Sequence, residues 1–136
     1  MTAGLIPAAA VHRAARARAL VRRELLAALA KYDLLLAPTS PHPAPAIASH
    51  TAPVTSKEEA AARFFARRSY TTPASLAGVP AISVPCGFTA RGLPIGLQLI
   101  GRPFAESTVL SAAHAWERAA GLSTRHPALA AAGAAL

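Results

Sequence analysis

The 136-residue chain has little of several features that define common classes of protein. No apolar run reaches the roughly 18 residues that a membrane-spanning helix needs, so we expect no membrane role. A single cysteine, Cys86, excludes an internal disulfide and fits a reducing, cytoplasmic location. The five histidines show no metal-ligand spacing, and no glycine-rich phosphate loop occurs. The sequence therefore predicts no metal and no cofactor.

Acidic residues are also scarce, with 6 Asp and Glu against 14 Lys and Arg, which gives a net charge of +8. Such an excess of positive charge can attract an anionic partner. However, 12 of the 14 basic residues are arginine, and they accompany an excess of alanine. A GC-rich coding sequence produces this pairing without any selection for nucleic acid. We therefore expect no nucleic-acid partner.

The first periodic segment, residues 8–31, predicts an amphipathic helix. Arg13, Arg16 and Arg23 lie opposite its apolar stripe, on a face that we expect to be solvated. Arg18 is the exception, because it falls within the apolar stripe. Two explanations stay open at this point. Either the arginine stem packs while the guanidinium reaches water, or this face meets a partner surface outside the chain.

A short aliphatic run, DLLLAP at 33–38, follows the predicted helix. It predicts a strand buried on both faces, as is typical of parallel sheets, and its position behind a helix indicates an α/β layer. Residues 38–53 carry five of the twelve prolines and cannot form regular structure, because each proline fixes φ and removes a donor. This segment is either a pocket-lining loop at the ligand-binding edge of the sheet or an inert linker.

Two further helices are predicted. Ser56 and Glu59 match a capping box at the start of a helix that runs from Lys57 to about Arg68. We expect Thr72-Pro73 to end it, since the residue before a proline avoids the α region. The last helix covers about 106–120, with apolar residues along one stripe.

Two alternating segments, 81–88 and 95–100, predict a β-hairpin, because the six residues between them include a glycine and are polar at the tip. Pro85 places the first strand at an edge of the sheet or at a bulge, since proline cannot donate to a β-ladder. In the second strand, Gly96 and Gln98 alternate with leucines. One side of the first strand should be apolar, formed by Ile82, Val84, Cys86 and Phe88.

No set of side chains in the sequence forms a catalytic constellation. Ser75 and Ser83 lack the strand-elbow motif G-x-S-x-G. Cys86 lies in an apolar strand without a neighbouring cation to activate it. The two lysines lie at a helix end and a helix start, where solvated lysines are expected. We therefore predict no catalytic residue in this chain.

Three segments of the chain carry a resemblance to a known family. The most specific is residues 76–101, LAGVPAISVPCGFTARGLPIGLQLIG, and the weaker ones are YDLLLAPTSPHPAP and AWERAAG. In these segments the chain resembles the C-terminal part of the amidase signature family. The resemblance implies an α/β fold, in which this chain forms the C-terminal part of the amidase signature fold. It would supply strands of a mixed sheet flanked by helices and would be incomplete as a domain. Residues 1–127 would form this segment, and 128–136 an alanine-rich tail that frays.

The resemblance also implies a function. The family hydrolyses carbon–nitrogen amide bonds with a Ser–cis-Ser–Lys triad, whose serines belong to a glycine- and serine-rich signature. No segment such as GGSSGG occurs here. We therefore expect a C-terminal fragment of an amidase-family hydrolase that is inactive alone, with a small-molecule amide as substrate of the complete enzyme. The alternative is a non-catalytic module that pairs with a separately encoded N-terminal amidase portion.

Thr39 and Arg68 are the candidate substrate-binding residues. Thr39 directly follows the strand at 33–38 and is placed to face the pocket. Arg68 takes the position at which the glutamine-dependent branch of the family has an acid that holds the amino group of glutamine. A cation there would not serve that purpose, which favours a general amidase. Ser75 stands where the family commonly has Asn.

Overall fold

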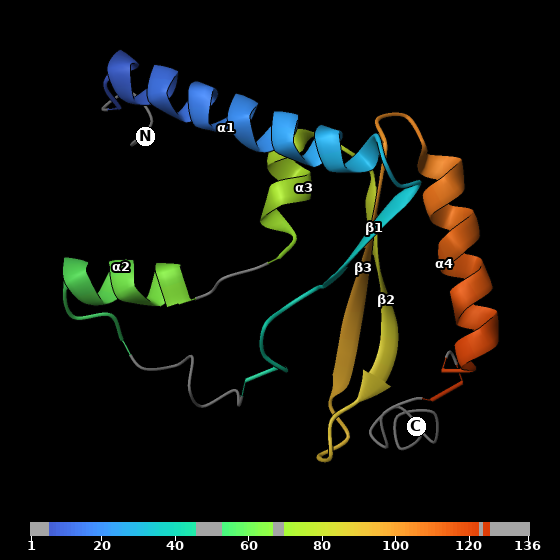
Figure 1. Cartoon of the computed structure of the whole chain (residues 1–136). Coiled ribbons are helices and arrows are strands. Elements are labelled where there is room, and N and C mark those ends of the chain that lie inside the picture. Colours follow the sequence, from blue (N-terminus) through green and yellow to red (C-terminus); the bar gives the residue numbers. More distant parts are fainter. Residues whose placement is uncertain (1–5, 46–52, 67–69, 123, 126–136) are drawn as a thin grey trace, which may run out of the picture.

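The computed structural model describes residues 6–45, 53–66, 70–122 and 124–125. Its elements are α1 (Ala8–Leu29), β1 (Leu34–Pro38), α2 (Lys57–Ala66), α3 (Thr72–Ala77), β2 (Ala81–Phe88), β3 (Pro94–Gly101) and α4 (Glu106–Ala120). The strands form one sheet in the order β1-β3-β2. In Figure 1, α4 runs along one side of the sheet, and α1 lies across the end at which β1 begins, with α3 beneath it. The predicted α/β class is confirmed.

The pairing of β1 differs from the sequence prediction. It pairs antiparallel with β3, from Leu34 opposite Gly101 to Pro38 opposite Leu97. It is also an edge strand of the described sheet, and its Leu36 is 64% exposed. The expectation of a parallel strand buried on both faces is therefore wrong for the described residues. The run of leucines indicated a strand, but it contained no information about the direction of its neighbour.

The hairpin prediction is confirmed. Pro85 was expected either in an edge strand or at a bulge, and both are found. β2 is an edge strand, and its register with β3 shifts between Pro85 and Gly87, which marks a β-bulge. Beyond the bulge, Gly87 lies opposite Ile95 and Phe88 opposite Pro94. An extra residue reverses the alternation of side chains. The unbroken alternation predicted that Phe88 shares the face of Ile82 and Val84. Because of the bulge, it does not.

The core lies between the sheet and α4. Val84 and Leu99 pack there against Val109 and Ala113, and Leu34, Ile82 and Leu97 surround this cluster. Gly101 lets α4 approach the sheet closely, because a Cβ at this position would overlap the side chain of Val109. The predicted bounds of the last helix, 106–120, agree with those of α4. No helix in the described part of the chain is long and apolar enough to cross a membrane.

Two arginines of α1 hold the C-terminal end of α3. Arg18 Nε donates a hydrogen bond to the carbonyl of Leu76 at 2.8 Å, and Arg22 Nη1 donates to the carbonyl of Ala77. The last carbonyl groups of a helix have no partner within it, and a positive charge there also suits the helix dipole. Arg18 thus lies on the apolar stripe because it caps a neighbouring helix. Its contact is inside the chain, which removes the need for a partner surface to explain it.

Arg102, the residue after β3, has the same role at the end of α1. Its Nε donates to the carbonyl of Leu29 at 2.9 Å, and its Nη2 donates to the carbonyl of Tyr32 at 3.3 Å. Nη2 also forms an ion pair with Asp33 Oδ1 at 3.1 Å. The ion pair is largely exposed and contributes little. The bonds to the carbonyl groups, in contrast, tie the first helix to the last strand.

The capping-box prediction at the start of α2 is half right. The N–H of Glu59 donates to Ser56 Oγ at 3.0 Å, as predicted. The Glu59 carboxylate, however, accepts from the N–H and hydroxyl of Thr55. The bond from the Thr55 N–H, then that from its hydroxyl, and the nearby charge of Arg63 lower the pKa of Glu59. Thr72-Pro73 does not end this helix, because the proline lies in the first turn of α3.

Replacement of Arg22 by methionine tests the capping of α3. Methionine keeps an apolar stem but leaves the carbonyl of Ala77, at the end of α3, without its arginine donor. We expect Arg22→Met to lower the free energy of unfolding by about 1–3 kcal/mol, measured by urea denaturation. The matched control is Arg23→Met on the solvent-exposed face of α1, for which we expect a change within about 0.5 kcal/mol. Equal losses in the two variants would contradict a capping role.

Candidate functional site

A pair of hydroxyl groups crosses the face of the sheet opposite α4. Thr39 follows β1 and Ser83 belongs to β2, yet Thr39 Oγ1 and Ser83 Oγ lie 2.5 Å apart and share a hydrogen bond. The N–H of Thr39 donates to the carbonyl of Gly96 at 2.9 Å, which extends the β1–β3 ladder by one residue. The pair therefore joins the two edge strands above the middle strand.

Gly96 makes this contact possible. A Cβ built on Gly96 would lie 2.7 Å from Thr39 Oγ1 and 3.0 Å from Ser83 Oγ. The first distance is shorter than any ordinary contact between a Cβ and an oxygen. Only glycine at this position of β3 leaves room for two side chains from different strands to meet.

Gln98 lies beside the hydroxyl pair. It is directly opposite Ser83 in the β2–β3 register, so the two side chains share one face of the sheet. Gln98 is 3% exposed, and its Oε1 has no hydrogen-bond partner among the described residues. A buried polar atom normally has a partner, because its lost contact with water is otherwise uncompensated. The free oxygen is therefore a feature that the function of the site should explain.

Two cavities flank the hydroxyl pair. One, of about 230 Å³, is bounded by Gln98 and Ser83 on the sheet and by α3 and the loop after it, with the further lining residues Thr71, Ala74, Ser75, Val79, Ala81 and Ile82. The other, of about 440 Å³, is bounded by Thr39, Gly96 and residues 40–45 of the proline-rich segment. The described part of that segment thus lines a cavity, which favours the pocket-lining alternative over an inert linker. Residues 46–52 lie outside the described residues.

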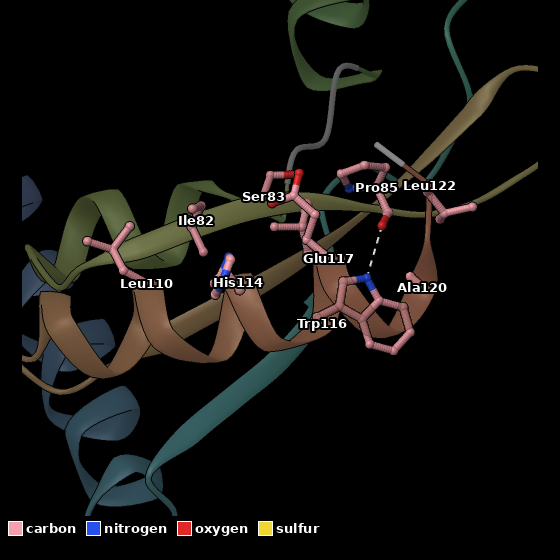
Figure 2. Close-up of a pocket in the computed structure, with 11 residues that line it drawn as sticks. Ile82, Ser83, Pro85, Leu110, His114, Trp116, Glu117, Ala120 and Leu122 are labelled. Carbon is pink, nitrogen blue, oxygen red and sulfur yellow. Dashed lines mark hydrogen bonds between the residues drawn. The ribbon is translucent and has the colours of Figure 1, made fainter. Parts of the chain in front are cut away.

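A third cavity lies between β2 and α4. This groove of about 320 Å³ is mostly apolar, and Figure 2 shows Leu110, His114 and Trp116 of α4 along it. The indole N–H of Trp116 donates to the carbonyl of Pro85 at 3.0 Å, so the ring ties the helix to the bulged strand. The hydroxyl pair lies on the other face of the sheet. Ser83 also lines this groove, so the groove and the polar site meet at β2, and His114 and Glu117 add polar side chains to its α4 wall.

The chemistry available at the hydroxyl pair is hydrogen bonding. Ser83 shares its hydrogen bond with another hydroxyl, Thr39, and not with a base that could accept its proton. Across the described residues, no group of three or more His, Cys, Asp and Glu is arranged to hold a metal ion. The arrangement can orient a polar ligand, and it provides no activated nucleophile.

The structure brings together some of the residues that the sequence singled out. Thr39 lies at the centre of the site, Ser75 lines the same cavity as Ser83, and Cys86 lies in the bulge. Arg68 and the tail at 128–136 lie outside the described residues. Gly96 and Gln98 were not predicted as site residues. The signal in the sequence that could have indicated them was Gln98 itself, a polar residue that shares one face of an otherwise apolar strand with Gly96.

Comparisons with known proteins agree with one another. The pattern of a family described as Amidase matches residues 5–110. A glutamyl-tRNA(Gln) amidotransferase subunit of Methanosarcina mazei is 46% identical over 115 residues, which are 85% of this chain and 22% of that protein. The corresponding protein of Brevibacillus brevis is 42% identical with the same coverage.

Solved structures give the same result. 6-Aminohexanoate cyclic dimer hydrolase superposes with a TM-score of 0.75 at 30% identity, covering 90% of this chain and 26% of that one. The glutamyl-tRNA(Gln) amidotransferase subunit of Thermotoga maritima superposes with a TM-score of 0.62 at 40% identity, covering 74% and 20%. The chain thus spans about a fifth to a quarter of the length of these relatives.

Replacement of Gly96 by alanine tests the geometry of the site. The added Cβ must displace Thr39 or Ser83, and we expect a loss of about 1–3 kcal/mol in the free energy of unfolding. The matched control is Gly87→Ala in β2, where a Cβ meets nothing within 4 Å and where we expect no loss. Urea denaturation of both variants measures the difference. Equal stability of the two would show that the hydroxyl pair does not depend on Gly96.

Proposed function

Because the chain belongs to the Amidase family, we propose that it supplies part of a hydrolase that acts on carbon–nitrogen amide bonds. In the complete enzyme, the amide acyl group would pass to a serine outside this chain, with loss of an amine or ammonia. Water would then release the acid. The observation that supports this role is a hydrogen-bonding site, formed by Thr39, Ser83 and Gln98, that faces a cavity and contains no base among its described residues.

The proposed role of this chain is to form one wall of the substrate pocket. Such a wall orients the amide and restricts water, while the reacting groups come from elsewhere. The substrate is a small-molecule amide. The named relatives include both amidotransferase proteins and a cyclic dimer hydrolase. The cation at Arg68, in a position where glutamine-dependent relatives would need an acid, favours the hydrolase.

The purified chain should therefore hydrolyse no amide. Among the described residues, Ser83 is bonded to a hydroxyl and not to a base that could take its proton, so we expect no release of ammonia above background from simple primary amides. We also expect no labelling of Ser75 or Ser83 by a fluorophosphonate. The matched control is Ser83→Ala, which should have the same background rate. Turnover that the wild-type chain shows and Ser83→Ala loses would overturn the proposal.

A second function is favoured by a different observation. Phe104, between β3 and α4, is 95% exposed and has a φ of 61°. Residues other than glycine rarely adopt this conformation, and it costs about 1–3 kcal/mol where it occurs. Neither the exposure nor the strain stabilises the chain by itself. We therefore also propose that the chain is a non-catalytic module whose Phe104 anchors it to a separately encoded N-terminal amidase portion.

Substitution of Phe104 separates its effect on the stability of the chain from its effect on association with the partner. Asparagine tolerates a positive φ, so Phe104→Asn should leave the stability of the chain unchanged or raise it by up to about 1 kcal/mol. The same change should weaken association at least about tenfold, because a buried aromatic anchor is lost. The binding partner would be 6-aminohexanoate cyclic dimer hydrolase lacking the quarter that aligns with this chain, and calorimetry would measure the affinity.

Phe104→Tyr is the control for this experiment, since it keeps the ring at the same position. It should retain the affinity of the wild-type chain. Undiminished association of Phe104→Asn would rule out Phe104 as the anchor. If the wild-type chain does not associate with the truncated hydrolase, the proposal that it is a binding module is contradicted.

A further inference from the structure

The buried oxygen of Gln98 is the strongest unexplained feature of the molecule. Its Oε1 has no donor among the described residues, although the side chain is 3% exposed and lines the cavity of about 230 Å³. An acceptor held in this way is complementary to a ligand that brings an N–H or O–H group. The cavity is the open space next to this side chain.

The other groups of the cavity define the chemistry of that ligand. None of the described lining residues is ionisable, and their polar side chains are those of Gln98, Ser83, Ser75 and Thr71. A charged ligand would lose its hydration here without an opposite charge to replace it. The net charge of +8 is a further reason against a cation. A neutral ligand is therefore favoured.

The hydroxyl pair adds a donor to this acceptor. Either hydroxyl of Thr39 and Ser83 can donate in their shared bond. When Thr39 donates, the proton of Ser83 is free to donate to a ligand oxygen. Because Ser83 lies directly opposite Gln98, the site then presents one donor and one acceptor side by side. A primary carboxamide has the complementary arrangement of a carbonyl oxygen and an N–H group on one carbon.

We propose that Gln98, with Ser83, binds the carboxamide head group of the substrate and discriminates against the carboxylate that hydrolysis produces. A carboxylate has acceptors only, so one of its oxygens would face Gln98 Oε1 without a proton between them. Thr39 is a positioning residue, because it acts through Ser83. The inference rests on the proposed function, and it adds a residue that distinguishes substrate from product.

The chain offers an unusually clear probe of this site. Gln98 is its single glutamine, and the sequence contains no asparagine. The side-chain NH₂ group of Gln98 therefore gives one unambiguous pair of signals in a ¹⁵N-correlated NMR spectrum of the full chain. Acetamide and acetate are the matched ligands, since they differ only in the head group.

Titration with acetamide should shift the Gln98 side-chain signals and the Ser83 amide signal in a saturable way. The dissociation constant should be in the millimolar range, as expected for a ligand of about four heavy atoms. Acetate should bind at least about tenfold more weakly. Gln98→Met, which keeps the length of the side chain without its polar atoms, should weaken acetamide binding by about tenfold, read from the Ser83 amide. Thr39→Val should weaken it less.

Three results would overturn the proposal. Equal shifts with acetamide and acetate would remove the discrimination. Shifts confined to the cavity at residues 40–45 would place the site elsewhere. The absence of any saturable shift would mean that water alone fills the cavity. If Gln98→Met does not fold, unchanged acetamide affinity in Ser83→Ala would serve as the contradicting result. The titration measures binding and the earlier assay measures turnover, so each proposal can fail without the other.

Discussion

The unpaired carbonyl groups at the ends of α1 and α3 are the constraint on which this arrangement depends. A helix cannot satisfy these groups internally, and here arginines from other elements do so. Arg22 reaches α3 from α1, and Arg102 reaches α1 from the end of β3. Since β2 begins four residues after α3, these bonds also fix where β2 starts. The position of Ser83 relative to Thr39 thus depends on caps that lie outside the site.

The sequence predicted the parts of the fold that local chemistry determines. Alternation and a glycine-containing turn defined the hairpin, and the lack of a donor on Pro85 placed it at an edge and a bulge. The direction of β1 was not predictable in this way, because it depends on a partner strand far along the chain. The same limit applied to Arg18, whose role requires the end of α3 to be nearby in space.

In the candidate site, too, some residues were predictable from local sequence and others depended on distant partners. Thr39 was predicted because it follows a strand directly, which is a local signal. Gly96 and Gln98 were not, because their importance depends on register: Gly96 matters only beneath the Thr39–Ser83 bond, and Gln98 only opposite Ser83. Glycine and glutamine, unlike the serines of the same cavity, are also not residue types that suggest a catalytic group in a sequence. Positive charge is abundant in this chain, and none of the described residues that line the cavity carries it.

The order β1-β3-β2 has a consequence for how the chain folds. β2 and β3 are joined by a short turn, whereas β1 lies far from β3 in the sequence and must still pair with it. Local contacts form faster than distant ones, so we expect the hairpin to form early and β1 to dock late. The bond between Thr39 and Ser83 joins the residue after β1 to β2, so it can form only when β1 has docked on the hairpin. An intact hydroxyl pair would thus mark a chain that has completed its folding.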